Sequence, residues 1–170
     1  MNSRAEKIAL RAVLVAAAFV LAWLEAQIPT FIAVPGVKLG LTNLVVLLAL
    51  YRLSWKDALV INLIRIILVG ITFGNLFSLW YSLAGGLLSG TGMILLKELA
   101  HPRLVTVSVA GALLHNLGQL LVAMFVLETS SLFYYLVVLW VSGAVAGFVL
   151  GILGAVVVKR VNSDIFSKKQ

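Results

Sequence analysis

The sequence predicts an all-α integral membrane protein, a bundle of six transmembrane helices forming a single domain over residues 1–170. Three observations support this fold class. The chain of 170 residues is 62% hydrophobic and 11% charged, whereas soluble domains are about half apolar and a quarter charged. Its mean hydropathy is +1.13. Apolar segments recur along the whole chain, separated by short polar or helix-breaking sequences.

Each predicted span is an apolar segment bounded by charged residues, proline or glycine. In chain order the spans are Ile8–Ala26, Leu39–Leu53, Lys56–Ile71, Leu76–Leu96, Leu104–Leu127 and Phe133–Val158. Because further apolar segments follow the first one, we expect an uncleaved helix there rather than a signal peptide. The second and third spans are short and are joined only by RLSWKD, which favours a tight helical hairpin.

The connection Gln27–Lys38, with the sequence QIPTFIAVPGVK, contains two prolines and a glycine, which end a helix. Apolar residues such as Phe31 and Ile32 favour a loop that packs back onto the protein. We therefore expect this loop to cover an outward-facing site. Phe73–Asn75 and Ala100–Pro102 mark the other clear breaks.

The basic residues predict the orientation of the chain, whose formal net charge is +7. If the N-terminus is cytoplasmic and the spans alternate, 11 of the 13 lysines and arginines fall on the cytoplasmic side. These are Arg4, Lys7, Arg11, Arg52, Lys56, Lys97, Arg103, Lys159, Arg160, Lys168 and Lys169. The pattern predicts a location in the cell membrane with both termini cytoplasmic, and it explains the charge without nucleic acid.

Arg65 is a cation within the third predicted span, about 12–14 Å from its inner boundary. At that depth an arginine costs about 2.5–3.5 kcal/mol even on mild insertion scales. Either it pairs with an acidic side chain, Glu25 or Glu128, or it is the counter-ion of an anionic ligand that enters from outside. Lys38 favours the second alternative, because this lone external lysine lies in the loop that would cover such a site.

Small and polar residues share one face of the fifth predicted span, around the sequence GALLHNLGQL. Spacings of three, four and seven align Ser108, Gly111, Ala112, His115, Gly118 and Gln119. Such a face contacts other helices or a cavity rather than lipid. It therefore predicts either an interhelical hydrogen-bond pair or part of a binding site. The candidate substrate-binding residues are Lys38, Asn43, Asn62, Arg65, His115 and Gln119.

Rows of small residues at four-residue spacing predict close helix packing elsewhere. They include Ser78, Ser82 and Gly86 in the fourth span, Gly143, Gly147 and Gly151 in the sixth, and Ala5, Ala9, Ala12 and Ala16 in the first.

Catalytic patterns are missing from the sequence. There is no cysteine, which excludes disulfides and cysteine-ligated metals. There is no aspartate-rich motif for magnesium and diphosphate, and no phosphate-binding glycine loop. The six acidic residues form no pair suited to acid–base catalysis, and one intramembrane histidine cannot form a closed metal site. We expect a protein that is not an enzyme and that uses no cofactor or metal.

The segment Val34–Leu68, VPGVKLGLTNLVVLLALYRLSWKDALVINLIRIIL, resembles the substrate-binding S components of energy-coupling factor (ECF) vitamin transporters. Those proteins commonly have a proline–glycine loop, a short second helix, a tight cytoplasmic turn and a third helix with polar residues. Through PGVKLGLTNL and HNLGQL the chain is more closely similar to a small membrane family labelled both "heptaprenyl diphosphate synthase component I" and "Gx transporter". The likeness covers nearly the whole chain.

The resemblance implies an S-component-like substrate-binding subunit of an ECF-type importer. Its ligand would be small and anionic, related to a vitamin, a quinone or an isoprenoid, and bound near the outer surface. Its partners would be the lipid membrane and a transmembrane coupling subunit with ATPase subunits, against which Ala12 and Ala16 would pack as an Ala-x-x-x-Ala motif. The ATPases would supply the energy, so no ATP site is expected in this chain.

Two alternatives stay open. One is a membrane subunit or scaffold of a polyprenyl diphosphate synthase, non-catalytic by itself. The other is an accessory subunit with no small ligand. An importer needs an outward-open pocket, a synthase scaffold needs its charged site on the cytoplasmic side, and an accessory subunit needs no pocket.

Overall fold

A computed structural model describes residues 4–27 and 40–167. These ranges form six α-helices and a short 3₁₀ helix, which confirms the predicted all-α bundle. The elements are α1 (Arg4–Gln27), α2 (Leu41–Arg52), α3 (Trp55–Phe73), α4 (Leu76–Ala100), α5 (Leu104–Val126), η1 (Ser130–Tyr135) and α6 (Leu136–Ser167). The predicted cover loop, apart from Gln27, lies outside the described residues.

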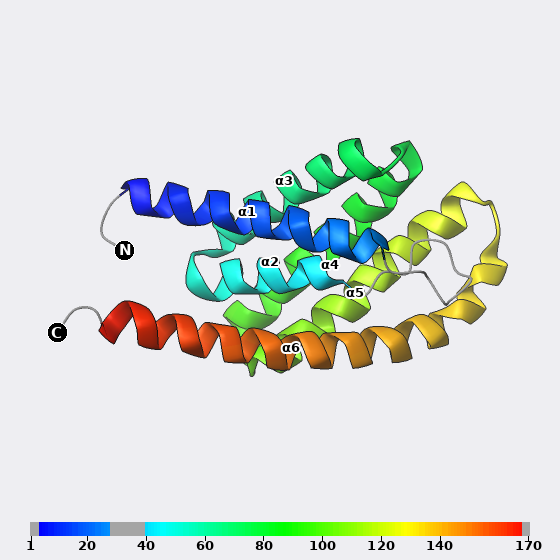
Figure 1. Cartoon of the computed structure of the whole chain (residues 1–170). Helices are drawn as coiled ribbons and strands as arrows, with labels where there is room; N and C mark the ends of the chain where they lie inside the picture. Colours follow the sequence, from blue (N-terminus) through cyan, green and yellow to red (C-terminus); the bar gives the residue numbers. More distant parts are fainter. Residues whose placement is uncertain (1–3, 28–39, 168–170) are drawn as a thin grey trace.

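The helices lie side by side, and the start of α1 and the end of α6 are at the same end of the bundle (Figure 1). We call this the terminal end, and we call the opposite end, where α1 and α3 finish, the distal end. Helices α4, α5 and α6 pack consecutively, while α1 packs on α2 and α3. The short helix α2 is central, since it contacts α1, α3, α5 and α6.

Among the described residues, four helical segments are long and apolar enough to cross a membrane: Lys7–Glu25, Leu76–Ala100, Leu104–Val126 and Ser130–Arg160. At 12 residues α2 is about 18 Å long, shorter than the roughly 30 Å of a hydrocarbon core. Helix α3 is long enough, but it carries Lys56, Asp57 and Arg65. Because other helices surround α2, its apolar residues form the protein core instead of a lipid-facing surface. That core includes Val45, Val46, Leu47, Ala49 and Leu50.

Local side-chain chemistry explains the helix boundaries. Ser54 caps α3 by accepting a hydrogen bond from the backbone N–H of Asp57 at 3.2 Å. Asn75 begins α4 with a reciprocal capping box to Ser78. His101 ends α4 in the left-handed conformation, with φ 46°. The predicted breaks after α3 and α4 are therefore confirmed.

Glycines let the last two helices approach closely. A Cβ atom added at Gly147 would lie 2.8 Å from the Cα of Val109, and one added at Gly151 would lie 2.8 Å from the Cα of Val105. Since these are backbone atoms, a side chain could be accepted only by moving α5 away from α6. The small-residue row on α6 is thus a packing seam, as predicted.

Basic side chains form hydrogen bonds and an ion pair at the terminal end. Lys97 donates to the carbonyl oxygen of Leu50 at 2.9 Å, and Arg52 donates to that of Val158. Leu50 lies in the last turn of α2, where carbonyl groups lack partners within their own helix, whereas the bond to Val158 links the end of α2 to α6. Arg11 on α1 forms a 2.6 Å ion pair with Asp57 on α3.

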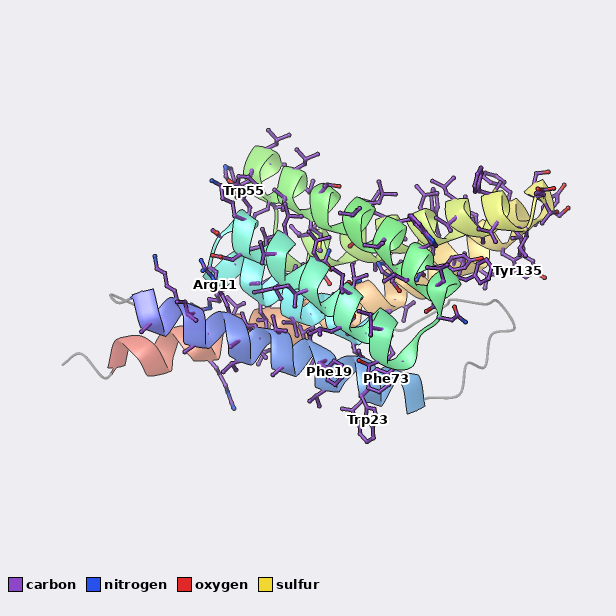
Figure 2. The ribbon with its side chains drawn as sticks, turned by 90° about the horizontal axis from the view of Figure 1, so that it is seen from above. Arg11, Phe19, Trp23, Trp55, Phe73 and Tyr135 are labelled. Carbon is purple, nitrogen blue, oxygen red and sulfur yellow. The ribbon has the colours of Figure 1, made fainter. Side chains whose placement is uncertain are left out.

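Aromatic side chains occur at the distal end. The rings of Phe19 and Phe73 have centroids 5.1 Å apart where α1 passes the end of α3. Figure 2 shows these rings with Trp23 nearby, and Tyr135 farther along the bundle. Exposed aromatic side chains such as Trp23 are typical of a membrane boundary.

Candidate functional site

The predicted intramembrane cation is buried and held by neutral side chains. Arg65 is 6% exposed. Its Nε donates to Oδ1 of Asn62 at 2.9 Å, one terminal nitrogen donates to the hydroxyl of Thr42, and the other donates to Oδ1 of Asn43 at 3.1 Å. These bonds use three of the five guanidinium donors, and all three acceptors are uncharged. They fix the orientation of the cation without neutralising it.

Asn62 links this cluster to α4. It lies one turn before Arg65 on α3, so its Oδ1 can accept from Nε while its Nδ2 donates to the carbonyl oxygen of Gly86 at 2.8 Å. A Cβ atom at Gly90 would lie 3.2 Å from Nδ2 of Asn62, so the amide packs directly against the backbone of α4. The side chain of Asn62 is therefore a bridge that positions Arg65.

Arg65 lines a small buried cavity of about 40 Å³ near the distal end. One polar side chain comes from each of five helices: Glu25 from α1, Thr42 from α2, Arg65 from α3, Ser82 from α4 and His115 from α5. The other described lining residues are Gly40, Ala22, Ile66 and Val69, which bring no polar side chain to the cavity.

Glu25 is the acidic residue of this cavity. It is 8% exposed, and its Oε1 accepts a hydrogen bond from the backbone N–H of Gly40 at 2.5 Å. Gly40 precedes α2 with φ 76°, a conformation that favours glycine. Glu25 also interacts electrostatically with Arg65. Of the two acidic partners that the sequence proposed for Arg65, Glu25 is near it, whereas Glu128 is exposed after α5.

The structure brings together most of the predicted site residues. Asn43 and Asn62 bind Arg65 directly, and His115 lines the same cavity. Gln119 is buried at 7% exposure but is not among the cavity-lining residues. It lies with His115 against the close approach of α4 at Gly85, where an added Cβ would be 3.0 Å from the Cγ of Gln119. Binding of a ligand by these residues stays a prediction.

The remaining predicted residues are Lys38, Ala12 and Ala16. Lys38 lies outside the described residues. Ala12 and Ala16 are exposed on α1, and their proposed contact with a partner stays a prediction. Sequence reasoning missed Thr42 as a ligand of Arg65 and treated Ser82 only as a packing residue. The sequence did offer a signal for Thr42, because it is adjacent to the predicted site residue Asn43 in the first turn of α2.

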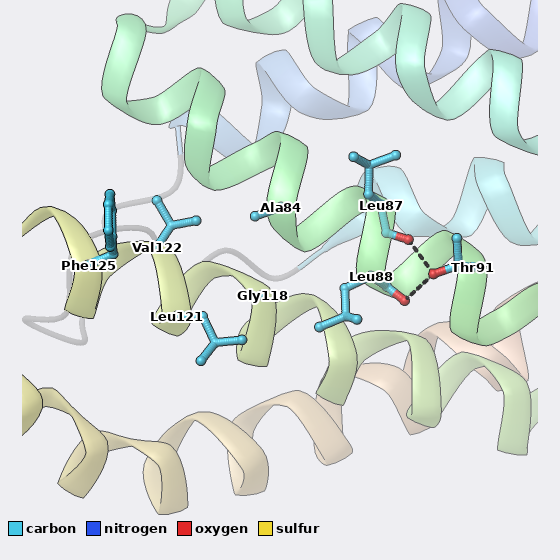
Figure 3. Close-up of a pocket in the computed structure, with 8 residues that line it drawn as sticks. All are labelled: Ala84, Leu87, Leu88, Thr91, Gly118, Leu121, Val122 and Phe125. Carbon is cyan, nitrogen blue, oxygen red and sulfur yellow. Dashed lines mark hydrogen bonds between the residues drawn. The ribbon is translucent and has the colours of Figure 1, made fainter.

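A larger apolar groove lies elsewhere, between α4 and α5 (Figure 3). Its volume is about 490 Å³, and its lining includes Leu121, Val122 and Phe125, the last of which is 85% exposed. The hydroxyl of Thr91 in this groove already donates to the carbonyl oxygens of Leu87 and Leu88 (Figure 3). Among the described residues that line the groove, none is charged and the hydroxyl of Thr91 is already bonded, whereas the smaller cavity is lined by Glu25 and Arg65.

Within the described part of the chain, no group of three or more histidine, cysteine or acidic residues is placed to hold a metal ion. Comparison with curated proteins and with solved structures gives no match. A family model described as "heptaprenyl diphosphate synthase component I" matches residues 14–157. This match covers every helix from α2 to α5 and most of α1 and α6. The chain therefore belongs to the heptaprenyl diphosphate synthase component I family.

Proposed function

We propose that this chain is the substrate-binding membrane subunit of an ECF-type importer, and that it captures a small ligand by an anionic group at Arg65. The observation that carries the proposal is the set of three neutral acceptors around a buried guanidinium at a cavity. An anion in that cavity would receive charge-assisted hydrogen bonds from a cation that is already oriented. The ligand would be related to a vitamin, a quinone or an isoprenoid.

The proposal requires the distal end to face outward. Basic side chains of Arg11, Arg52 and Lys97 bind near the terminal end, opposite the cavity. Cytoplasmic segments of membrane proteins are enriched in lysine and arginine. This asymmetry supports cytoplasmic termini in the cell membrane, with the cavity reached from outside.

In this proposal the chain has no catalytic step, and ATP hydrolysis takes place in partner ATPases. The transmembrane coupling subunit would contact α1. Ala18, Ala22 and Glu25 are buried on one side of that helix, whereas Ala12 and Ala16 are exposed. Small exposed residues allow a partner helix to approach closely.

The family description supports one alternative, a non-catalytic membrane subunit or scaffold of a polyprenyl diphosphate synthase. Such a subunit would bind an isoprenoid diphosphate beside a soluble catalytic chain. Its charged site would need to face the cytoplasm, so orientation distinguishes the two functions.

Native mass spectrometry of the detergent-extracted protein tests the proposal. We expect a copurified small molecule on the wild-type protein and on the control variant Arg103→Leu, in which an exposed arginine outside the cavity is replaced. The same adduct should be absent from Arg65→Leu. Retention of the adduct by Arg65→Leu would refute binding at Arg65, and an isoprenoid diphosphate as the adduct would favour the synthase subunit.

A further inference from the structure

We propose that the anionic group of the ligand is a carboxylate, and that the hydroxyl of Ser82 donates a hydrogen bond to it beside Arg65. This inference rests on the proposed function and narrows its ligand class. It also gives Ser82 a direct role in binding, although the spacing of small residues on α4 indicated only helix packing for it.

Ser82 brings an available donor to the cavity. It lies on α4 and lines the cavity together with Arg65. Elsewhere in the chain, Thr72 and Thr91 donate their hydroxyl groups to the carbonyl oxygen one turn earlier in their own helix, at 2.7 Å in both cases. In the described part of the chain, the hydroxyl of Ser82 makes no such bond. Its hydrogen can therefore be donated to a group inside the cavity.

Arg65 supplies two further donors. Each terminal nitrogen of a guanidinium carries two hydrogens, so the bonds to Thr42 and Asn43 leave one N–H on each of these nitrogens. Two such N–H groups can bind both oxygens of one carboxylate. An ionised carboxylate has about four acceptor sites. It can therefore accept from both N–H groups of Arg65 and from the hydroxyl of Ser82 at the same time.

The size of the cavity favours a carboxylate over a phosphate. A buried water molecule needs about 10–15 Å³ of such space, so the cavity of about 40 Å³ has room for about three waters. A planar carboxylate is of this size, whereas a tetrahedral phosphate is larger and a diphosphate is larger still. Because the cavity is this small, a group bound at Arg65 also lies within reach of Ser82. The rest of the ligand would extend beyond the described lining residues.

The test measures the binding of acetate, inorganic phosphate and pyrophosphate to the full-length protein in detergent, at equal ionic strength. Apparent dissociation constants come from ligand-dependent melting temperatures. We expect wild type to bind acetate more tightly than phosphate or pyrophosphate. Ser82→Ala should weaken acetate binding by about 10- to 100-fold, as expected for the loss of one hydrogen bond to a charged acceptor. Arg65→Leu should abolish acetate binding.

A matched control is Ser142→Ala, because the hydroxyl of Ser142 donates to the carbonyl oxygen of Leu139 in α6 and is not among the described groups that line the cavity. This variant should bind acetate as wild type does. Without a ligand, Ser82→Ala should melt at nearly the wild-type temperature, since it removes a hydroxyl that makes no bond among the described residues. A clear loss of unliganded stability would show a structural role for Ser82 instead.

The outcomes separate this inference from the proposed function. Unchanged acetate affinity in Ser82→Ala would refute the contact with Ser82. Tighter binding of phosphate or pyrophosphate than of acetate would refute the carboxylate, while loss of that binding in Arg65→Leu would still support an anion site. If none of the three anions stabilises wild type, the inference is wrong, and the copurified ligand decides the proposed function separately. If Ser82→Ala does not fold, the order of the three anions on wild type decides.

Discussion

Replacing Arg65 with leucine separates two effects of the buried charge, its effect on the stability of the protein and its contribution to ligand binding. The substitution removes the guanidinium from the interior and leaves its three acceptors on Asn62, Thr42 and Asn43 without that donor. Two of these bonds join α3 to α2, and the third is within α3. Asn62 retains its own bond to Gly86, so the bridge to α4 survives.

In the unliganded protein, the stability lost with the hydrogen bonds of Arg65 nearly cancels the stability gained by removing a charge from the membrane interior. Interhelical hydrogen bonds in membrane proteins contribute about 0.6 kcal/mol on average and up to about 1.7 kcal/mol, so losing two of them costs about 1–3 kcal/mol. Removing an arginine from mid-membrane gains about 2.5–3.5 kcal/mol on insertion scales. We therefore expect the free energy of unfolding to change by less than about 2 kcal/mol. Ligand binding has no such offset, and losing two charge-assisted bonds of about 1.5–3 kcal/mol each weakens it at least about 100-fold.

Thermal unfolding measures the stability of the unliganded protein, and titration of the copurified ligand measures its affinity independently. At about 2–4 °C per kcal/mol for a chain of this size, the melting temperature of unliganded Arg65→Leu should stay within about 8 °C of wild type. Arg65→Lys should bind with intermediate affinity, because an ammonium keeps the charge but loses the planar fork. Unchanged affinity in Arg65→Leu would refute the ligand role. A loss of about 3–5 kcal/mol of stability would instead show that Arg65 is the structural partner of Glu25, since removing one member of a buried pair strands the other.

Three further predictions concern orientation, docking and packing. A cysteine introduced at Ser167 should resist impermeant thiol reagents in whole cells while one at Thr30 is labelled, and the reverse pattern would overturn the orientation. Ala16→Trp should leave the isolated protein folded, because the site is exposed, yet prevent copurification with a coupling subunit; a complex that survives would contradict docking there. Gly118→Ala should destabilise the protein by about 1–3 kcal/mol in a denaturation experiment, since its Cβ would lie 2.7 Å from the backbone oxygen of Ala84. Gly92→Ala is its control and should cost less, because it meets the end of a flexible leucine side chain, and equal losses would contradict the packing argument.

The helix boundaries could be predicted because local chemistry determines them. Asn75 and Ser54 are caps that act within one turn of their own helices. Small residues on α6 pack at the spacing their sequence predicts. The position of Arg65 along its helix was also predictable: counting from the start of the third span placed it near mid-helix, and Arg65 lies in the middle of α3, where it is buried by the other helices.

The partners of Arg65 were harder to predict, because they depend on how helices rotate and pack. Thr42 and Asn43 are adjacent in sequence, and periodicity alone cannot say that both oxygens reach one guanidinium. Gln119 shares a helical face with His115, yet it packs at the approach of α4 instead of lining the cavity. Residues one turn apart on one face can therefore both pack against the same helix while only one of them lines the cavity.

The length of α2 connects the fold to the site. A helix of 12 residues is about 18 Å long, roughly 12 Å less than the hydrocarbon core. Because α2 is surrounded by other helices and ends near the terminal end, its first turn starts inside the bundle, at the depth of Arg65. A spanning helix in its place would bring apolar mid-helix residues to that depth, whereas the short helix brings the N–H of Gly40 and the oxygens of Thr42 and Asn43. Those groups bind Glu25 and Arg65, so the shortness of α2 helps to bury two opposite charges at one cavity.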